Sequence, residues 1–141
     1  FHHGVFPRSL DQIWKLFGRN VALKVIPIGR ESMRHSHTKA MIRAMQRYPI
    51  DIITHPGAKV DIDSRLLARS AAEHDVALEI NAGHGYMTAD YIKIAMEEGV
   101  SFVINSDAHT PERVGDFKRA IDIATEAGLD PAHIINAEEG S

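Results

Sequence analysis

Four side chains of the kinds that bind metal ions stand at or just after short apolar segments of this sequence. They are His2, His55, Asp107 and His109. The runs 51–54 and 101–105, which precede the last three, have the length and composition of buried parallel strands. In α/β folds, ligands bind beyond the carboxyl ends of such strands. The pattern therefore predicts a divalent-metal site with hydrolytic chemistry, on which His55, Asp107 and His109 converge.

The local sequence around these residues suits ligand binding. Asp107 and His109 are two positions apart directly after a strand, and on extended backbone such side chains point the same way. His55 opens a turn in the loop 54–57, whose proline fixes the turn and whose glycine lets backbone approach a ligand. The alternatives are a solvated loop pair at 107–109 and, at position 55, a turn histidine bonded to a backbone carbonyl.

Two further histidine positions are candidates of a weaker kind. His84 lies in the glycine-flanked loop 81–86, where it is a candidate substrate contact or else a histidine of a flexible loop. His2 and His3 would point to opposite sides of an extended chain, so at most one of them enters a site. Taken alone, such a terminal pair is more typical of a surface position.

Composition narrows the class of protein. A chain of 141 residues with 44% hydrophobic content can build one core, hence one domain. It has no cysteine, so any metal must be bound by His, Asp, Glu, backbone or water, which suits Zn, Mn or Fe. A net charge of −3 argues against a dedicated nucleic-acid or membrane surface. No membrane-length apolar run or signal peptide is visible in a chain that does not begin with Met, and we expect a cytoplasmic protein.

Helical and strand-like segments alternate along the chain. Helices are predicted at 38–48, 61–74, 88–98 and 115–127, and strands at 50–54, 76–81, 101–105 and 134–135. Acidic residues fall in the first turn of the second helix, Thr88 or Asp90 can cap the third, and Gly128 ends the fourth. Short connections between alternating elements predict an α/β fold with a parallel sheet covered by helices. Residues 7–36 break this rhythm, and we interpret them as an insertion on the ligand-facing side.

Taken together, these segments resemble the C-terminal part of a PHP-domain (polymerase and histidinol phosphatase) metallohydrolase, and most of all the YcdX-like phosphatases. The matching segments are 1–6, 54–57, 76–81, 105–110 and 130–136. The resemblance implies a distorted TIM-like barrel of seven parallel strands with helices, whose N-terminal strands are missing from this sequence. Residues 1–141 would then be the C-terminal portion of a single PHP domain, with a longer segment at 7–36 than the family suggests.

The resemblance also implies a cluster of up to three divalent ions (Zn, Mn or Fe) at the strand ends. Matched motif by motif, His2, His55, Asp107 and His109 would be metal ligands, and the last two would serve catalysis. Glu79 lies inside the middle strand and does not match the bridging glutamate of the family. The rest of the ligand set has no counterpart here.

The implied activity is hydrolysis of phosphomonoesters, in which cations bind the phosphate and activate a water. His84 and Lys59 would contact the phosphate of a small substrate. Two alternatives stay open, namely a nuclease or proofreading module attached to a DNA polymerase and a non-catalytic PHP fragment. We also expect a missing upstream segment, or another chain, to cover the exposed edge of the sheet.

Overall fold

The computed structural model describes residues 30–137, which contain a three-stranded parallel sheet and four α-helices. In chain order, the elements are α3 (Arg30–Arg47), β1 (Ile52–Ile53), α4 (Ser64–Glu73), β2 (Ala77–Asn81), α5 (Ala89–Met96), β3 (Phe102–Asn105) and α6 (Lys118–Ala127). Short 3-10 turns stand at Pro111–Arg113 and Pro131–His133. The predicted α/β class and parallel sheet are confirmed. Within residues 30–137, however, the sheet is open and does not close into a barrel.

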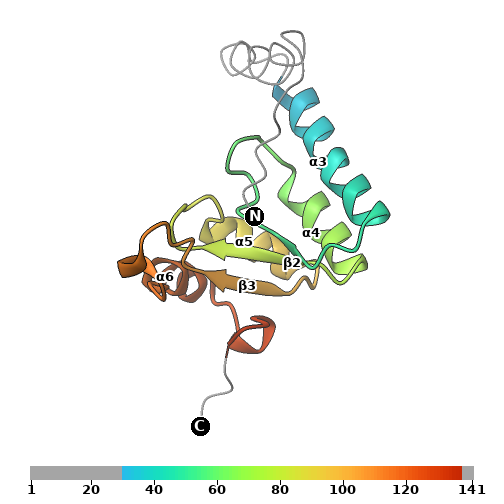
Figure 1. Cartoon of the computed structure of the whole chain (residues 1–141). Coiled ribbons are helices and arrows are strands. Elements are labelled where there is room, and N and C mark those ends of the chain that lie inside the picture. The colour runs from blue at the N-terminus through green and yellow to red at the C-terminus, as the bar shows by residue number, and fades with distance from the viewer. Residues whose placement is uncertain (1–29, 138–141) are drawn as a thin grey trace, which may run out of the picture. The chain divides into compact units, whose positions relative to one another are not determined.

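The sheet buries one face against helices. The strand order is β1-β2-β3 with every pair parallel, and Figure 1 shows β2 and β3 side by side and pointing the same way. Paired residues of parallel strands lie on the same side, so Leu78 shares a face with Phe102, and Ile80 shares it with Ile104. Helices α4 and α6 contact the strands, with α5 between the two helices. Leu78, Ile80 and Phe102 are almost wholly buried there, which makes this face the centre of the core.

Helix α3 begins earlier than the sequence predicted. It starts at Arg30 rather than at position 38, so residues 30–36 of the predicted insertion are helical. The reason is that only the second half of this helix buries apolar side chains, with Met41, Ile42 and Met45 in or against the core. Apolar periodicity therefore gave no signal for the polar first half. The remainder of the predicted insertion, residues 7–29, lies outside the described residues.

Helix ends follow local capping chemistry. The Asp63 carboxylate accepts a hydrogen bond from the N–H of Leu66 at 3.0 Å, so α4 begins after this residue and not at position 61. The expected acidic first turn is therefore wrong, because the carboxylate caps the helix from outside. Thr88 caps α5 as predicted, and Gly128 ends α6 with a φ of 73°. Helix α6 itself begins at Lys118, after the predicted start at 115.

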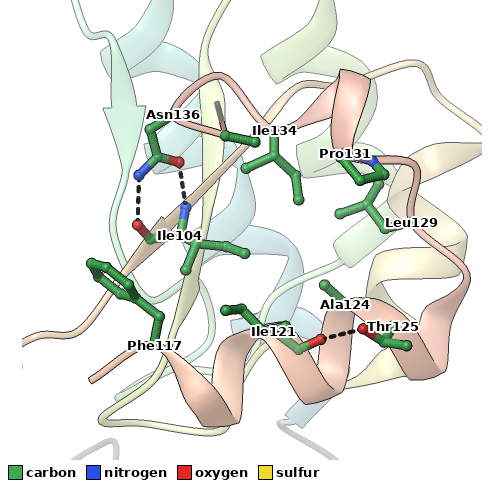
Figure 2. Close-up of a pocket in the computed structure, with 10 residues that line it drawn as sticks. Ile104, Phe117, Ile121, Ala124, Thr125, Leu129, Pro131, Ile134 and Asn136 are labelled. Carbon is green, nitrogen blue, oxygen red and sulfur yellow. Dashed lines mark hydrogen bonds between the residues drawn. The ribbon is translucent and has the colours of Figure 1, made fainter. Parts of the chain in front are cut away.

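The C-terminal segment satisfies the outer edge of β3. The predicted strand at 134–135 is reduced to one parallel bridge between Ile134 and Phe102. Beyond it, the Asn136 side chain accepts a hydrogen bond from the N–H of Ile104 at 3.0 Å and donates one to the Ile104 carbonyl at 2.8 Å (Figure 2). A side-chain amide thus occupies the place of a neighbouring strand, and this edge is not open for pairing.

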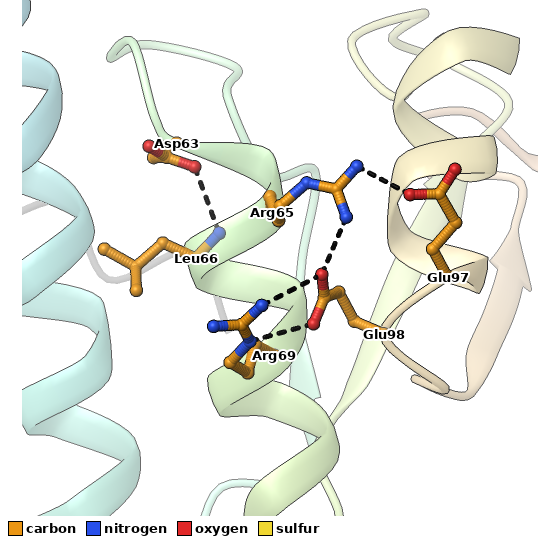
Figure 3. Close-up of polar contacts among 6 residues, drawn as sticks. All are labelled: Asp63, Arg65, Leu66, Arg69, Glu97 and Glu98. Carbon is orange, nitrogen blue, oxygen red and sulfur yellow. Dashed lines mark hydrogen bonds and ion pairs between the residues drawn. The ribbon is translucent and has the colours of Figure 1, made fainter.

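An ion-pair network joins α4 to the end of α5 (Figure 3). Arg65 donates to Glu98 at 2.8 Å and to Glu97 at 2.6 Å, while Arg69 donates to Glu98 at 2.9 Å. The Arg69 and Arg65 guanidinium groups hold the pKa of Glu98 below its ordinary value. The folded state therefore favours the charged carboxylate, and stability is linked to the titration of this group.

The ion-pair network should make stability depend on pH through Glu98. The contribution of Glu98 is fully present above the ordinary pKa of glutamate and is lost as pH falls through the lowered pKa of the folded state. We expect Glu98→Gln to lower the thermal midpoint by a few degrees at neutral pH and to flatten its acid dependence below the ordinary glutamate pKa. Thermal unfolding at several pH values measures both. Glu97→Gln, which removes one bond of the network, is the control; an equal effect of the two variants would contradict the central position of Glu98.

Candidate functional site

Two of the predicted site residues stand just past neighbouring strands in an unusual backbone conformation. His55 follows β1 and Asp107 follows β3, each two positions beyond the strand end. Their φ angles are 30° and 50°, which lie in the left-handed region that non-glycine residues rarely adopt. Such a conformation costs about 1–2 kcal/mol per residue and is maintained only where the surrounding structure enforces it. Within residues 30–137, Asp75 is the third non-glycine residue with a positive φ, and it lies at the other end of the sheet, before β2.

The loop after β2 brings His84 to these residues. Its Nε2 atom lies 3.3 Å from Oδ2 of Asp107, close enough for electrostatic attraction when the imidazole is protonated, but the atoms are not aligned for a hydrogen bond. Oδ2 of Asp107 is buried and has no hydrogen-bond partner. The His84 ring meets the His55 ring edge-on, with centroids 5.9 Å apart, and lies 5.7 Å from the ring of Tyr86. His55, His84 and Asp107 thus come from three loops to one edge of the sheet.

A buried glutamate, which the sequence analysis set aside, connects these loops. Glu79 is only 4% exposed and points to the face of the sheet opposite the helices. Its Oε2 accepts hydrogen bonds from the N–H of His55 at 2.5 Å and from Nδ2 of Asn81 at 3.1 Å, and its Oε1 accepts one from Nδ2 of Asn105 at 2.9 Å. Oδ1 of Asn81 in turn accepts from the N–H of His84 at 2.7 Å. We call Glu79, His55, Asn81 and Asn105 the Glu79 network.

The Glu79 network fixes the backbone from which the candidate side chains extend. One carboxylate satisfies a donor at each of three strand ends, which accounts for how a charged group can be buried here. The available sequence signal was an acidic residue inside an otherwise apolar strand, two positions before an asparagine. That signal could not identify Asn105 as a partner, because the register of β2 with β3 was unknown.

The remaining predicted site residues differ in what the structure describes of them. His109 is exposed, and its Nδ1 lies 2.8 Å from the main-chain oxygen of Asp107. Asp107 is in the left-handed region, so the expectation that the two side chains align along extended backbone is wrong. Lys59 is exposed in the loop after β1, and no ion pair of Lys59 appears in the part of the chain that the structure describes. His2 lies outside the described residues. The assigned roles of all these residues stay predictions.

The donor chemistry of the site suits a divalent cation, but the described ligands are few. Imidazoles of His55 and His84 and a carboxylate of Asp107 with one unpartnered oxygen are groups that Zn, Mn or Fe would bind. Among residues 30–137, no three His, Asp or Glu side chains are grouped closely enough to hold a metal ion. A metal site here would therefore need ligands from outside the described part.

A cavity in another part of the described residues has different chemistry. An apolar pocket of about 270 Å³ lies between α6, β3 and the C-terminal segment (Figure 2). Its lining includes Ile104, Phe117, Ile121, Leu129 and Ile134 and has no ionisable side chain. It is formed on the helix-covered side of the sheet, away from Glu79 and Asp107, and offers no group for phosphate chemistry.

Among the described helices, none is long and apolar enough to cross a membrane.

Comparison with known proteins identifies bacterial relatives named as probable phosphatases. The chain is 34% identical to one from Shewanella frigidimarina (strain NCIMB 400) over 119 residues, which is 78% of this chain and 48% of the relative. It is 39% identical over 106 residues to one from Shewanella sp. (strain ANA-3), covering 69% of this chain and 42% of the relative. It is 34% identical over 113 residues to one from Edwardsiella ictaluri (strain 93-146), which covers 74% of this chain and 46% of the relative.

These matches establish distant homology to probable phosphatases. The chain spans about half the length of the curated relatives it matches. No protein-family model matches the sequence.

Proposed function

We propose that this chain is the C-terminal portion of a PHP-type metal-dependent phosphoesterase that hydrolyses phosphomonoesters. The observation that carries the proposal is the gathering of His55, His84 and Asp107 at the carboxyl edge of a parallel sheet. Ligand sites of α/β folds form at this edge. Homology to probable phosphatases supports the same class of reaction.

In this proposal each side chain has a distinct task. Asp107 would bind a divalent cation through its buried oxygen, which has no hydrogen-bond partner. His55, whose backbone N–H donates to Glu79, would be a second ligand. His109 and His2 would complete the ligands that this chain supplies. A bound cation would supply Lewis-acid polarisation of the phosphate and an activated water at neutral pH. His84, whose side chain is 49% exposed beside Asp107, would donate a hydrogen bond to a phosphate oxygen. Lys59 would be a further phosphate contact from the loop after β1.

Part of the barrel and of its ligand set would lie outside the described residues. Three parallel strands would be part of a seven-stranded barrel, and the remaining ligands would come from outside residues 30–137. Residues upstream of the described part, or another chain, would continue the sheet beside β1. This arrangement agrees with a match that extends over about half of each relative.

Phosphate release by the complete protein tests the proposal. We expect release from para-nitrophenyl phosphate and other monoesters when Mn, Zn or Fe is added, and its loss after chelation, because in this proposal a bound cation activates the attacking water. A protein that releases no phosphate from any monoester but degrades DNA ends would favour the polymerase-associated nuclease. A protein that shows neither activity and retains no metal would favour the non-catalytic fragment.

A further inference from the structure

The first turn of α6 places an arginine against the loop that carries His84. A β-carbon added to Gly85 would lie 2.1 Å from Nη2 of Arg119 and 2.8 Å from its Cζ, so only glycine leaves room for the guanidinium at this place. A β-carbon added to Gly83 would lie 3.3 Å from Cβ of Asp107. The two glycines that flank His84 therefore admit Asp107 at one position and Arg119 at the other. The guanidinium thus lies against the loop that carries His84.

Among the described residues, no carboxylate offsets the charge of Arg119. The structure gives Arg119 no ion pair within residues 30–137, and its side chain lies at the surface. Its neighbour Lys118 is paired with Asp122 at 2.6 Å, and Arg65 and Arg69 are paired with Glu98. An arginine whose planar group rests on a glycine backbone loses part of its rotational freedom without losing its charge. It is therefore prepared to bind an anion.

We propose that Arg119 is a specificity-determining residue that binds the phosphoryl oxygens of the substrate together with His84. This inference rests on the proposed function and adds a residue that no motif indicated. A guanidinium presents two parallel N–H donors, which match two oxygens of a phosphate. His84 is next to Gly85 in the chain and has a half-exposed side chain, so its imidazole would offer a third donor to the same phosphate. The site would thus recognise a phosphate group whatever alcohol it is esterified to.

The contact with Gly85 provides a second way to test the role. Alanine at position 85 requires no left-handed backbone, but its β-carbon would displace the guanidinium of Arg119. Gly85→Ala should therefore imitate Arg119→Ala at the level of phosphate binding. In a protein that already carries Arg119→Ala, the same glycine substitution should have little further effect, because the displaced group is gone.

The experiment measures binding of inorganic phosphate to the complete protein by calorimetry, together with KM and kcat for para-nitrophenyl phosphate. We expect Arg119→Ala and Gly85→Ala each to weaken phosphate binding about tenfold, as loss of a charge-assisted hydrogen bond does. The KM should rise by a similar factor while kcat changes little. Lys118→Ala, which removes a paired charge from the same turn, should leave phosphate binding unchanged.

The outcomes separate this inference from the function on which it rests. If the wild type binds phosphate through Arg119 but hydrolyses no monoester, the proposed function fails and the binding role stands. If hydrolysis proceeds and Arg119→Ala binds phosphate as the wild type does, the inference is wrong. Wild-type protein that does not bind phosphate at all overturns it as well. If the double variant weakens phosphate binding by the sum of the two single effects, the contact of Arg119 with Gly85 is not what positions the guanidinium.

Discussion

Asp107→Asn should remove most phosphate release and leave the fold intact. Asparagine has the same shape as aspartate and is among the few residues that tolerate a left-handed backbone, so the φ of 50° should persist. The amide carries no charge and is a poorer metal ligand, so it can neither offset a cation nor present the buried oxygen as an anion. We expect a loss of roughly hundredfold in kcat/KM and a lower metal content.

The matched control for this variant is Asp75→Asn. Asp75 has a similar backbone conformation, with a φ of 55°, but lies before β2, at the opposite end of the strands from Asp107. It should retain wild-type activity and metal content, which are measured by phosphate release and elemental analysis. Circular dichroism should show both variants folded. Full activity of Asp107→Asn with unchanged metal would show that Asp107 is not a ligand.

Glu79→Gln should reduce both stability and activity. Three N–H donors converge on the buried carboxylate, and a glutamine amide can replace only one of its two oxygens as an acceptor. At least one donor would then face an NH2 group inside the protein. Loss of a hydrogen bond to a buried charged group costs about 2 kcal/mol, which we expect as the decrease in free energy of unfolding.

The functional effect of Glu79→Gln should exceed what unfolding explains. Because the carboxylate holds the backbone of His55 and, through Asn81, that of His84, its loss should displace both side chains from the site. We expect kcat/KM to fall about tenfold at a temperature where the variant is fully folded, with metal content measured alongside. Glu73→Gln, an exposed change at the end of α4, is the control. Wild-type stability in Glu79→Gln would refute a structural role for the Glu79 network.

The sequence alone predicted the features that depend on residues close together in the chain. Apolar runs located β2 and β3, and Thr88 and Gly128 marked helix ends, because burial and capping depend on neighbouring residues. Placement of His55 and Asp107 just past strand ends was likewise visible in the chain. The first half of α3 was missed because it buries little apolar surface and so has no periodic pattern.

By itself, the sequence determined that this protein has a parallel α/β core with His and Asp side chains at the strand ends. Only the tertiary structure decided which residues meet there. The pairing of Glu79 with Asn105, the approach of His84 to Asp107, and the position of Arg119 on Gly85 all depend on strand register and helix packing. Register is set by the burial of whole faces, which involves residues far apart in the chain, so a single apolar run does not identify its partner residues.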